Sequence, residues 1–292
     1  MGGDDEALLA SWDLALHDKA GSTRRLYREV LTGFARWLPD GASLAGAERR
    51  DCQRYFAALG EEGRAQATIR SRWIALRSFY GWAADEGEVA ENPMGDITVQ
   101  RAEPPPVAIP DDHDVALLLQ ACGGRDFAAR RDLALIRTAA ATGGRIGELC
   151  GVGVADVDLK NRILSLRRGK ARKGRGAGID PETARTIDRY LRVRADHRLA
   201  DLPALFITRF GPLTRKGAHA MLRRRCAEAG IPALHFNQLR DRFAYEYLRR
   251  GGTERNLAAL GGWTDASITR RYGSALASDR ALSEYDTLGG VL

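Results

Sequence analysis

The sequence has no apolar run that approaches the ~18 residues a membrane-spanning helix needs. Its first six residues, MGGDDE, lack the basic and then apolar pattern of a secretory signal peptide. The four cysteines are scattered, and none has a metal-ligand spacing to another cysteine or to a histidine. These absences argue against membrane, secreted and metal-dependent proteins. We therefore expect a cytoplasmic protein with reduced thiols, without a cofactor and without a membrane partner.

Positive charge is unevenly distributed along the 292 residues. The chain has a formal net charge of +7. Residues 1–108 hold slightly more acidic than basic side chains, so the positive excess belongs to residues 109–292. A basic surface attracts polyanions, and this distribution favours a nucleic-acid backbone as the partner of the second part of the chain.

A run of three prolines, residues 104–106, divides the sequence. Proline lacks the backbone N–H and restricts the residue before it, so no helix continues through this run. A short proline run forms a semi-rigid, extended spacer. We therefore expect an N-terminal domain at residues 1–100, a linker at 101–109 and a second domain at 110–292.

Helical periodicity extends through the first domain. It predicts helices over residues 8–17, 23–38 and 47–59, and a fourth that begins with Thr68 as its N-cap. From Ile69 the fourth helix carries an apolar stripe at i, i+4, i+7 and i+11. Its arginines, Arg70, Arg72 and Arg77, lie away from that stripe, where they face either solvent or DNA.

The second domain combines many helices with two short strands. The pattern predicts helices over residues 111–121, 126–141, 181–197, 215–229, 237–249, 254–259, 264–271 and 277–285. Strands are expected at residues 163–166 and 177–179, around a turn at residues 167–175 in which six of nine residues are basic, called here the basic turn. The expected fold class is therefore mainly α, with a four-helix N-terminal domain and a small antiparallel sheet in the α-rich second domain.

Two arginines, a lysine and a tyrosine stand in separate boxes of the second domain. Arg145 lies in TGGRIGEL, Lys170 in the basic turn, Arg240 in NQLR and Tyr272 in RRYG. Metal-free cleavage of a phosphodiester needs cations at the non-bridging oxygens, a nucleophile and a proton for the leaving group. A guanidinium binds two oxygens and keeps its charge, and a phenol can attack.

The order and spacing of these boxes resemble those of the tyrosine recombinases, the phage-integrase and Xer-like family. The resemblance covers nearly the whole chain. It implies a core-binding domain that clamps the duplex and a catalytic domain that cuts and rejoins double-stranded DNA at specific sites. The reaction would pass through a 3′-phosphotyrosyl intermediate without metal, ATP or cofactor. The resemblance also implies a homotetramer on synapsed DNA and leaves room for accessory DNA-bending proteins.

The resemblance assigns roles to single residues. Arg145 and Arg240 match the two catalytic arginines, and Tyr272 matches the nucleophile. Lys170 matches the hairpin lysine that protonates the leaving 5′ oxygen, and Lys173 is the alternative for this role.

Three positions depart from the family's usual pattern. Most members have histidine where this chain has Asn237, and often also where it has Asp241. Asparagine can donate to a phosphate oxygen but cannot exchange a proton at neutral pH, so His235 is an alternative for the base. Trp263 stands where Cre-type members have tryptophan and most others histidine; its indole N–H can donate. Glu148 is placed to support a neighbouring backbone or arginine.

Other basic residues are candidates for contacts with DNA. They are Arg24, Arg25, Arg28, Arg64, Arg70, Arg72 and Arg77 in the first domain, and Arg172, Lys173 and Arg175 in the basic turn. A tail with Leu276, Leu282, Tyr285 and Leu288 could dock on a neighbouring protomer. Two other functions remain open. One is type IB topoisomerase activity, and the other is DNA binding by a catalytically decayed relative, which Asn237 keeps open.

Overall fold

The chain divides into two compact units, Met1–Pro105 and Pro106–Leu292, called here the N-terminal and C-terminal units. The computed structural model describes residues 2–100, 109–167, 174–263, 272, 276, 281 and 285–287. The helices expected at 264–271 and 277–285, and the centre of the basic turn, fall largely or wholly outside these residues. No helix in the described ranges is both long enough and apolar enough to cross a membrane.

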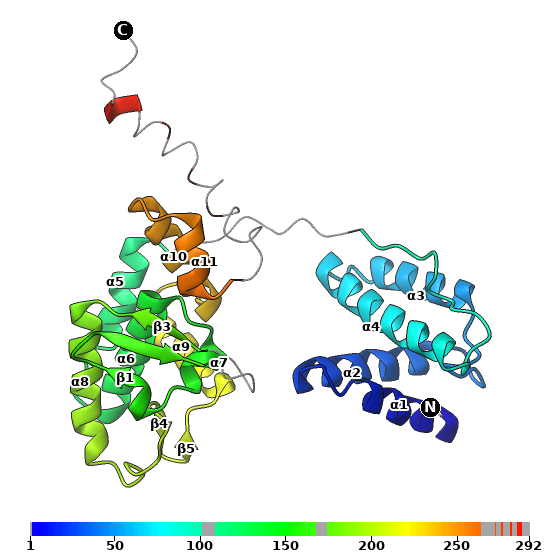
Figure 1. Ribbon diagram of the computed structural model, residues 1–292, viewed down its shortest axis with the longest axis horizontal. Helices are drawn as coiled ribbons and strands as arrows, with labels where there is room; N and C mark the ends of the chain where they lie inside the picture. Colours follow the sequence, from blue (N-terminus) through cyan, green and yellow to red (C-terminus); the bar gives the residue numbers. More distant parts are fainter. Residues whose placement is uncertain are drawn as a thin grey trace. The chain divides into compact units, whose positions relative to one another are not determined.

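The described part of the N-terminal unit, residues 2–100, contains four helices: α1 (Gly3–Ala15), α2 (Gly21–Trp37), α3 (Arg49–Glu61) and α4 (Gln66–Asp85) (Figure 1). All four were predicted, but the predicted N-cap of α4 was wrong. The N-cap is Ala65, whose carbonyl accepts from the backbone N–H of Thr68 at 2.8 Å. The first turn of α4 therefore forms without a side-chain cap.

Aromatic rings fill the core of the N-terminal unit. Trp12 of α1 packs edge-on against Phe79 of α4, with ring centroids 5.3 Å apart. Tyr80 is fully buried, and its hydroxyl donates to the carbonyl of Leu44 at 3.0 Å, which satisfies the one polar atom of the ring. Ile69 is buried too. The predicted apolar stripe of α4 is thus the face that holds the unit together.

The described part of the C-terminal unit is α-rich and contains two small antiparallel sheets, one of three strands and one of two strands. Its elements are α5 (Asp112–Ala121), α6 (Phe127–Thr142), α7 (Ile146–Cys150), the 3-10 turn Val154–Asp156, β1 (Val157–Asp158), β2 (Ile163–Leu166), β3 (Arg175–Gly178), α8 (Pro181–Ala195), β4 (Ile207–Thr208), β5 (Gly211–Pro212), α9 (Arg215–Glu228), α10 (Phe236–Arg249) and α11 (Glu254–Gly261). Strands β1, β2 and β3 form an antiparallel sheet in that order, with Leu166 opposite Arg175. The predicted fold class is confirmed.

Side-chain caps explain where several of these helices begin. Asp126 accepts from the N–H groups of Ala128 and Ala129 at the start of α6, at 2.9 and 3.0 Å. Asp180 does the same for α8, where Pro181 occupies the first helical position. Each cap satisfies N–H groups that have no partner within the helix.

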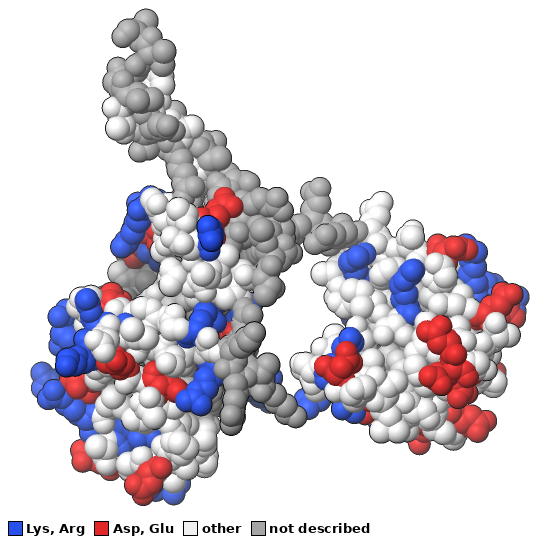
Figure 2. Space-filling model, viewed as in Figure 1, with Lys and Arg blue, Asp and Glu red and all other residues white. Residues whose placement is uncertain are grey.

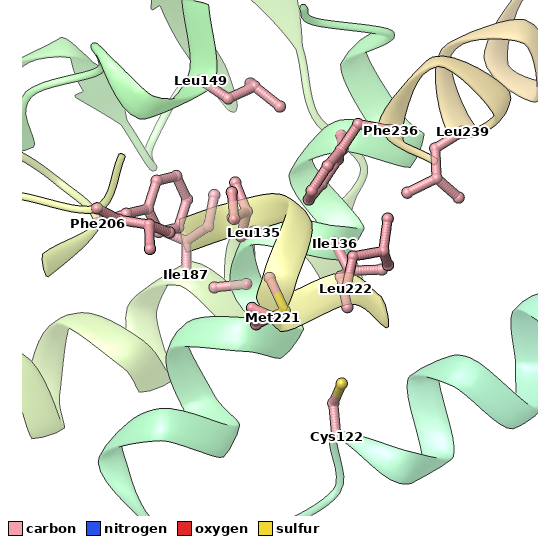
Figure 3. Close-up of a cluster of buried hydrophobic side chains, with 14 of the residues drawn as sticks. Cys122, Leu135, Ile136, Leu149, Ile187, Phe206, Met221, Leu222, Phe236 and Leu239 are labelled. Atoms are coloured by element: carbon pink, nitrogen blue, oxygen red, sulfur yellow. The ribbon is translucent and has the colours of Figure 1, made fainter. Parts of the chain in front are cut away.

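One hydrophobic cluster joins helices α5 to α10 of the C-terminal unit (Figure 3). Leu135 of α6, Ile187 of α8, Leu222 of α9 and Leu239 of α10 are each fully buried in it. Burial of such a side chain stabilises the fold by about 1.5–3 kcal/mol. The cluster therefore fixes α6 and α10, whereas α11 packs through Leu257 in a separate cluster with Trp263 and Tyr272.

Candidate active site

An open cleft of about 820 Å³ in the C-terminal unit gathers most of the catalytic and supporting residues predicted from the sequence. Six of them line it: Arg145, Glu148, Asn237, Arg240, Trp263 and Tyr272. Ile146, Gly147, Arg167, Arg215 and Asp241 complete the lining. Lys170, Arg172 and Lys173 lie outside the described residues.

The C-terminal end of α11 holds three arginine side chains. Three consecutive carbonyl oxygens accept from them: Leu260 from Arg175 Nε at 2.6 Å, Gly261 from Arg240 Nη2 at 2.8 Å, and Gly262 from Arg145 Nη2 at 3.4 Å. Carbonyls in the last turn of a helix have no partner within it and form the negative end of the helix dipole. The guanidiniums supply both the missing hydrogen-bond donors and a favourable positive charge. This helix end therefore orients all three of them.

Arg240 is the most enclosed of these arginines, with only 6% of its surface exposed. Its Nη1 donates to the carbonyl of Gly143 at the end of α6, opposite the Gly261 contact. The Trp263 ring covers it, 3.9 Å from Cζ to the ring centroid. Burial, followed by repulsion from Arg145 and Arg175, lowers the pKa of Arg240 to about 10. The positive charge of the Arg240 guanidinium is thus only partly balanced by neighbouring negative groups.

Two glycines permit this arrangement. Gly143 has a φ of 57°, and a Cβ there would lie 2.4 Å from Cδ1 of Phe243. A Cβ on Gly261 would lie 1.7 Å from Cζ3 of Trp263. Both distances are far inside van der Waals contact. Glycine therefore lets an aromatic ring close over each of the two carbonyl groups that anchor Arg240.

Arg145 occupies the N-cap position of α7, directly after the Gly-Gly break. Its side chain is 47% exposed, and its Nη1 donates to Oε1 of Glu148 at 3.2 Å. Oε2 of Glu148 accepts from the backbone N–H of Arg145 at 3.0 Å and from Nη2 of Arg175 at 3.1 Å. Burial would raise the pKa of Glu148, but these contacts outweigh burial and lower it. The expected support by Glu148 is present.

The side chain of Arg175 turns inward, although the sequence predicts an exposed contact to DNA. It was grouped with Arg172 and Lys173 as a contact to DNA, yet its side chain is only 13% exposed. Pairing with β2 carries it inward to Glu148 and to the end of α11. Its Nη1 is buried without a hydrogen-bond partner among the described residues. Arg175 is therefore part of the arginine cluster beneath the cleft.

Tyr272 lies at the cleft with 4% of its surface exposed. Its hydroxyl donates to Oδ1 of Asp241, the residue after Arg240 on α10. Its ring centroid lies 6.2 Å from that of Trp263. The phenol oxygen, the two anchored arginines and the indole thus meet in one cleft, although their residues are widely separated in the sequence.

Asn237 and His235, the two candidates for the role that histidine has in most family members, both lie at the start of α10. Asn237 is exposed and lines the cleft. His235 is the N-cap of α10, lies outside the cleft lining, and has its ring centroid 6.5 Å from that of His219. Asn237 therefore holds the position from which a side chain reaches the cleft.

Comparison with known protein families accounts for both units. The Phage integrase family model matches residues 111–278, and the Phage integrase, N-terminal SAM-like domain model matches residues 11–87. The chain belongs to the phage integrase family of tyrosine recombinases.

Named relatives support this assignment. Tyrosine recombinase XerD of Ralstonia nicotianae is 30% identical over 260 residues, 87% of this chain and 83% of that protein. Tyrosine recombinase XerC of Herpetosiphon aurantiacus is 29% identical over 275 residues, 91% and 88% of the two chains. The Tn1549 transposon integrase bound to transposon right-end DNA shares the fold, with a TM-score of 0.77, 19% identity, and 97% and 99% coverage.

Arg215 of this recombinase was not singled out from the sequence, yet it lines the cleft. It is the first residue of α9, after the N-cap Thr214, and it is exposed. A cation at a helix N-terminus is unfavourable, because the dipole is positive there. Arg215 therefore does not stabilise α9, and its position directly after the N-cap could have indicated a role in the cleft.

The arginines of the N-terminal unit separate into two groups. A groove of about 830 Å³ is lined by side chains of α2, α3, α4 and the loop between α3 and α4, among them Arg25, Arg28, Arg36, Arg64 and Arg72. Arg72 Nη1 donates to the hydroxyl of Tyr55 at 2.9 Å, beside the partly exposed Trp37. The groove of the recombinase thus combines basic and aromatic side chains.

Three other candidate arginines lie outside that groove. Arg70 and Arg77 lie over the Trp73 ring at 5.3 and 5.2 Å and donate to carbonyls of the segment after α4. Arg24 pairs with Asp13. On the face seen in Figure 2, acidic side chains cover part of this unit and basic side chains lie between them.

Proposed function

We propose that this tyrosine recombinase cuts and rejoins double-stranded DNA at a specific site by attack of Tyr272 on the scissile phosphodiester. The attack yields a 3′-phosphotyrosine and a free 5′-hydroxyl. The observation that carries the proposal is the meeting of the Tyr272 hydroxyl with Arg145 and Arg240 in one cleft. Because the phosphotyrosine retains the energy of the phosphodiester, rejoining requires neither ATP nor a new high-energy bond.

Arg145 and Arg240 would bind the non-bridging oxygens of the phosphate. Both are already anchored by carbonyls, so little reorganisation is needed when DNA arrives. Burial, and after it repulsion from Arg145 and Arg175, lowers the pKa of Arg240, and a bound phosphate would offset both by supplying negative charge. Arg175 supports this cluster from beneath and does not contact the DNA backbone in this proposal.

Three further residues complete the proposed chemistry. Asn237 and the indole N–H of Trp263 are neutral donors to the phosphate. Lys170 protonates the leaving 5′ oxygen, with Lys173 as the alternative. The basic turn that carries both lysines also contributes contacts to the DNA backbone through Arg172.

The N-terminal unit, up to a linker at residues 101–109, is the proposed DNA clamp. Its basic groove presents Arg64 and Arg72 to the phosphate backbone, and the aromatic side chains extend the contact surface. Assembly as a tetramer on synapsed DNA, in the cytoplasm, is part of the same proposal. It is supported by the lambda integrase tetramer bound to a Holliday junction, which shares the fold with a TM-score of 0.72 and 17% identity.

A nicked suicide duplex tests this function. Wild-type protein should become covalently linked to the DNA, and Tyr272→Phe should not, because only the nucleophilic oxygen is lost. Tyr272→Phe should bind the duplex with nearly unchanged affinity. Tyr285→Phe is the matched control, since Tyr285 is half exposed and lies outside the cleft lining. A covalent complex formed by Tyr272→Phe would show that another residue attacks.

The comparisons do not favour the two alternative functions. The relatives reported above are recombinases, not topoisomerases. Relaxation of supercoiled DNA without the recombination site would nevertheless indicate topoisomerase-like activity. A decayed relative that only binds DNA would leave the suicide substrate unlinked.

A further inference from the structure

We propose that Asp241 is the general base that accepts the phenol proton of Tyr272 as its oxygen attacks phosphorus. The inference rests on the function proposed above. The Tyr272 hydroxyl donates to Oδ1 of Asp241, so the acceptor already contacts the reacting group. Both residues line the cleft that holds Arg145 and Arg240. This contact occurs at one of the positions where the sequence departs from the usual pattern of the family.

The nucleophile requires such help. A phenol has a pKa near 10, so roughly one part in a thousand is ionised at pH 7. Its oxygen becomes a good nucleophile only as the proton leaves. Asn237 cannot take that proton, and His235 lies outside the cleft lining. The chain must therefore supply a base from elsewhere.

Among the described residues that line the cleft, two carboxylates could act as the base, Glu148 and Asp241. Both oxygens of Glu148 are occupied by Arg145 and Arg175. Asp241 is the carboxylate that contacts the phenol. Its position is fixed because the preceding residue, Arg240, is anchored between the ends of α6 and α11.

The proposed step balances as follows. The O–H bond of Tyr272 breaks, and the proton passes to Asp241 while the Tyr272 oxygen bonds to phosphorus. The bond between phosphorus and the 5′ oxygen breaks, and that oxygen takes a proton from a separate acid. In rejoining, the oxygen of the 5′-hydroxyl bonds to phosphorus and its proton returns to that separate acid, while the bond between phosphorus and Tyr272 breaks and the departing tyrosine oxygen recovers its proton from Asp241. Protein kinases likewise use an aspartate to accept a hydroxyl proton during phosphoryl transfer.

The pH dependence should reveal the base. The other charged groups of the described chain that line the cleft are Arg145, Glu148, Arg167, Arg215 and Arg240. Arginines keep their protons across neutral pH, and the lowered pKa of Glu148 keeps it ionised. Without the base, attack depends on the small population of ionised phenol, which increases about tenfold per pH unit below its pKa.

The test is single-turnover linkage to the suicide duplex by Asp241→Asn and Asp241→Ala. Asparagine can still accept the phenol hydrogen bond but cannot accept its proton. Both variants should link about 10²–10⁴-fold more slowly at pH 7, and their rates should rise steeply between about pH 6 and pH 9 while the wild-type rate changes much less. Asp241→His should recover part of the loss, since imidazole accepts a proton.

Glu246→Gln is the matched control, because it removes a negative charge from the same helix. Glu246 pairs with Arg249 at 2.8 Å and does not line the cleft. It should leave the linkage rate unchanged. Wild-type linkage rates in Asp241→Asn would overturn the proposal and leave Asp241 a positioning role. Faster linkage by Asp241→Ala would also overturn it, because the contact would then hold Tyr272 back from attack. Slow linkage with a rate that does not change with pH would overturn it as well. Failure of wild-type protein to link would instead refute the proposed function itself.

Discussion

Replacing Gly261 by alanine tests whether the end of α11 positions the catalytic arginines. The backbone of Gly261 is helical, so alanine is acceptable there in conformation. The added Cβ, however, would lie 1.7 Å from Cζ3 and 2.0 Å from Cε3 of Trp263. Ordinary carbon contacts lie near 3.5–4.0 Å, so the indole must move by roughly 2 Å. That ring covers Arg240, whose Nη2 is held by the Gly261 carbonyl.

We expect two measurable consequences of Gly261→Ala. Overpacking should lower the free energy of unfolding by about 1–3 kcal/mol, measured by urea denaturation. Misplacement of Arg240 by about 1 Å or more should slow single-turnover linkage to the suicide duplex by about 10²-fold. DNA affinity, measured by titration, should change little, because most backbone contacts lie elsewhere in the proposed complex.

Two comparisons show whether the indole transmits the effect. Gly81→Ala in α4 is the matched control, since a Cβ there meets nothing within 4 Å. It should stabilise the protein by about 0.5–1 kcal/mol and leave linkage unchanged. In a Trp263→Ala background, Gly261→Ala should cost almost no stability, because the clashing ring is absent. An equal cost in both backgrounds, or wild-type linkage by Gly261→Ala, would refute the reasoning.

Three further predictions concern single residues of the site. Asn237→Ala should slow linkage by about 10²-fold, the loss typical of one oxyanion donor, whereas His235→Ala should be mild; the opposite ranking would place His235 in the cleft. Lys170→Ala should slow cleavage of ordinary DNA far more than cleavage of a 5′-bridging phosphorothiolate, whose thiolate leaves without a proton; equal losses would remove Lys170 from the acid role. Glu148→Gln should lower the free energy of unfolding at pH 7, measured by urea denaturation. Because the pKa of Glu148 is lowered from 4.5 in the folded state, this difference should vanish as the pH falls through the folded pKa, and a constant difference would contradict the assignment.

Local patterns were sufficient to predict most helices of the described chain. Asp126 and Asp180 mark helix starts in the sequence because their side chains cap the N–H groups that follow. Thr68 misled for the same reason, since it is a good capping residue that lies within the first turn of α4. The capping preference of Thr68 thus did not decide where α4 begins, because the helix extends two residues further toward the N-terminus.

The site was predictable only in part. Resemblance to the family located Arg145, Arg240 and Tyr272, which share a cleft despite their separation in sequence. No local signal could show that Arg175 turns inward, because its partners lie at the distant end of α11. The contact between Asp241 and Tyr272 likewise depends on tertiary structure alone.

Identification of the residue linked to DNA tests the central claim most directly. Wild-type protein trapped on the suicide duplex would be digested with nuclease and protease, and the modified peptide would be sequenced by mass spectrometry. Our account predicts a phosphotyrosyl adduct on Tyr272, in which the scissile phosphate joins the tyrosine to the 3′ end of the cleaved strand. An adduct on Tyr285, on another residue or at a 5′ phosphate would contradict it.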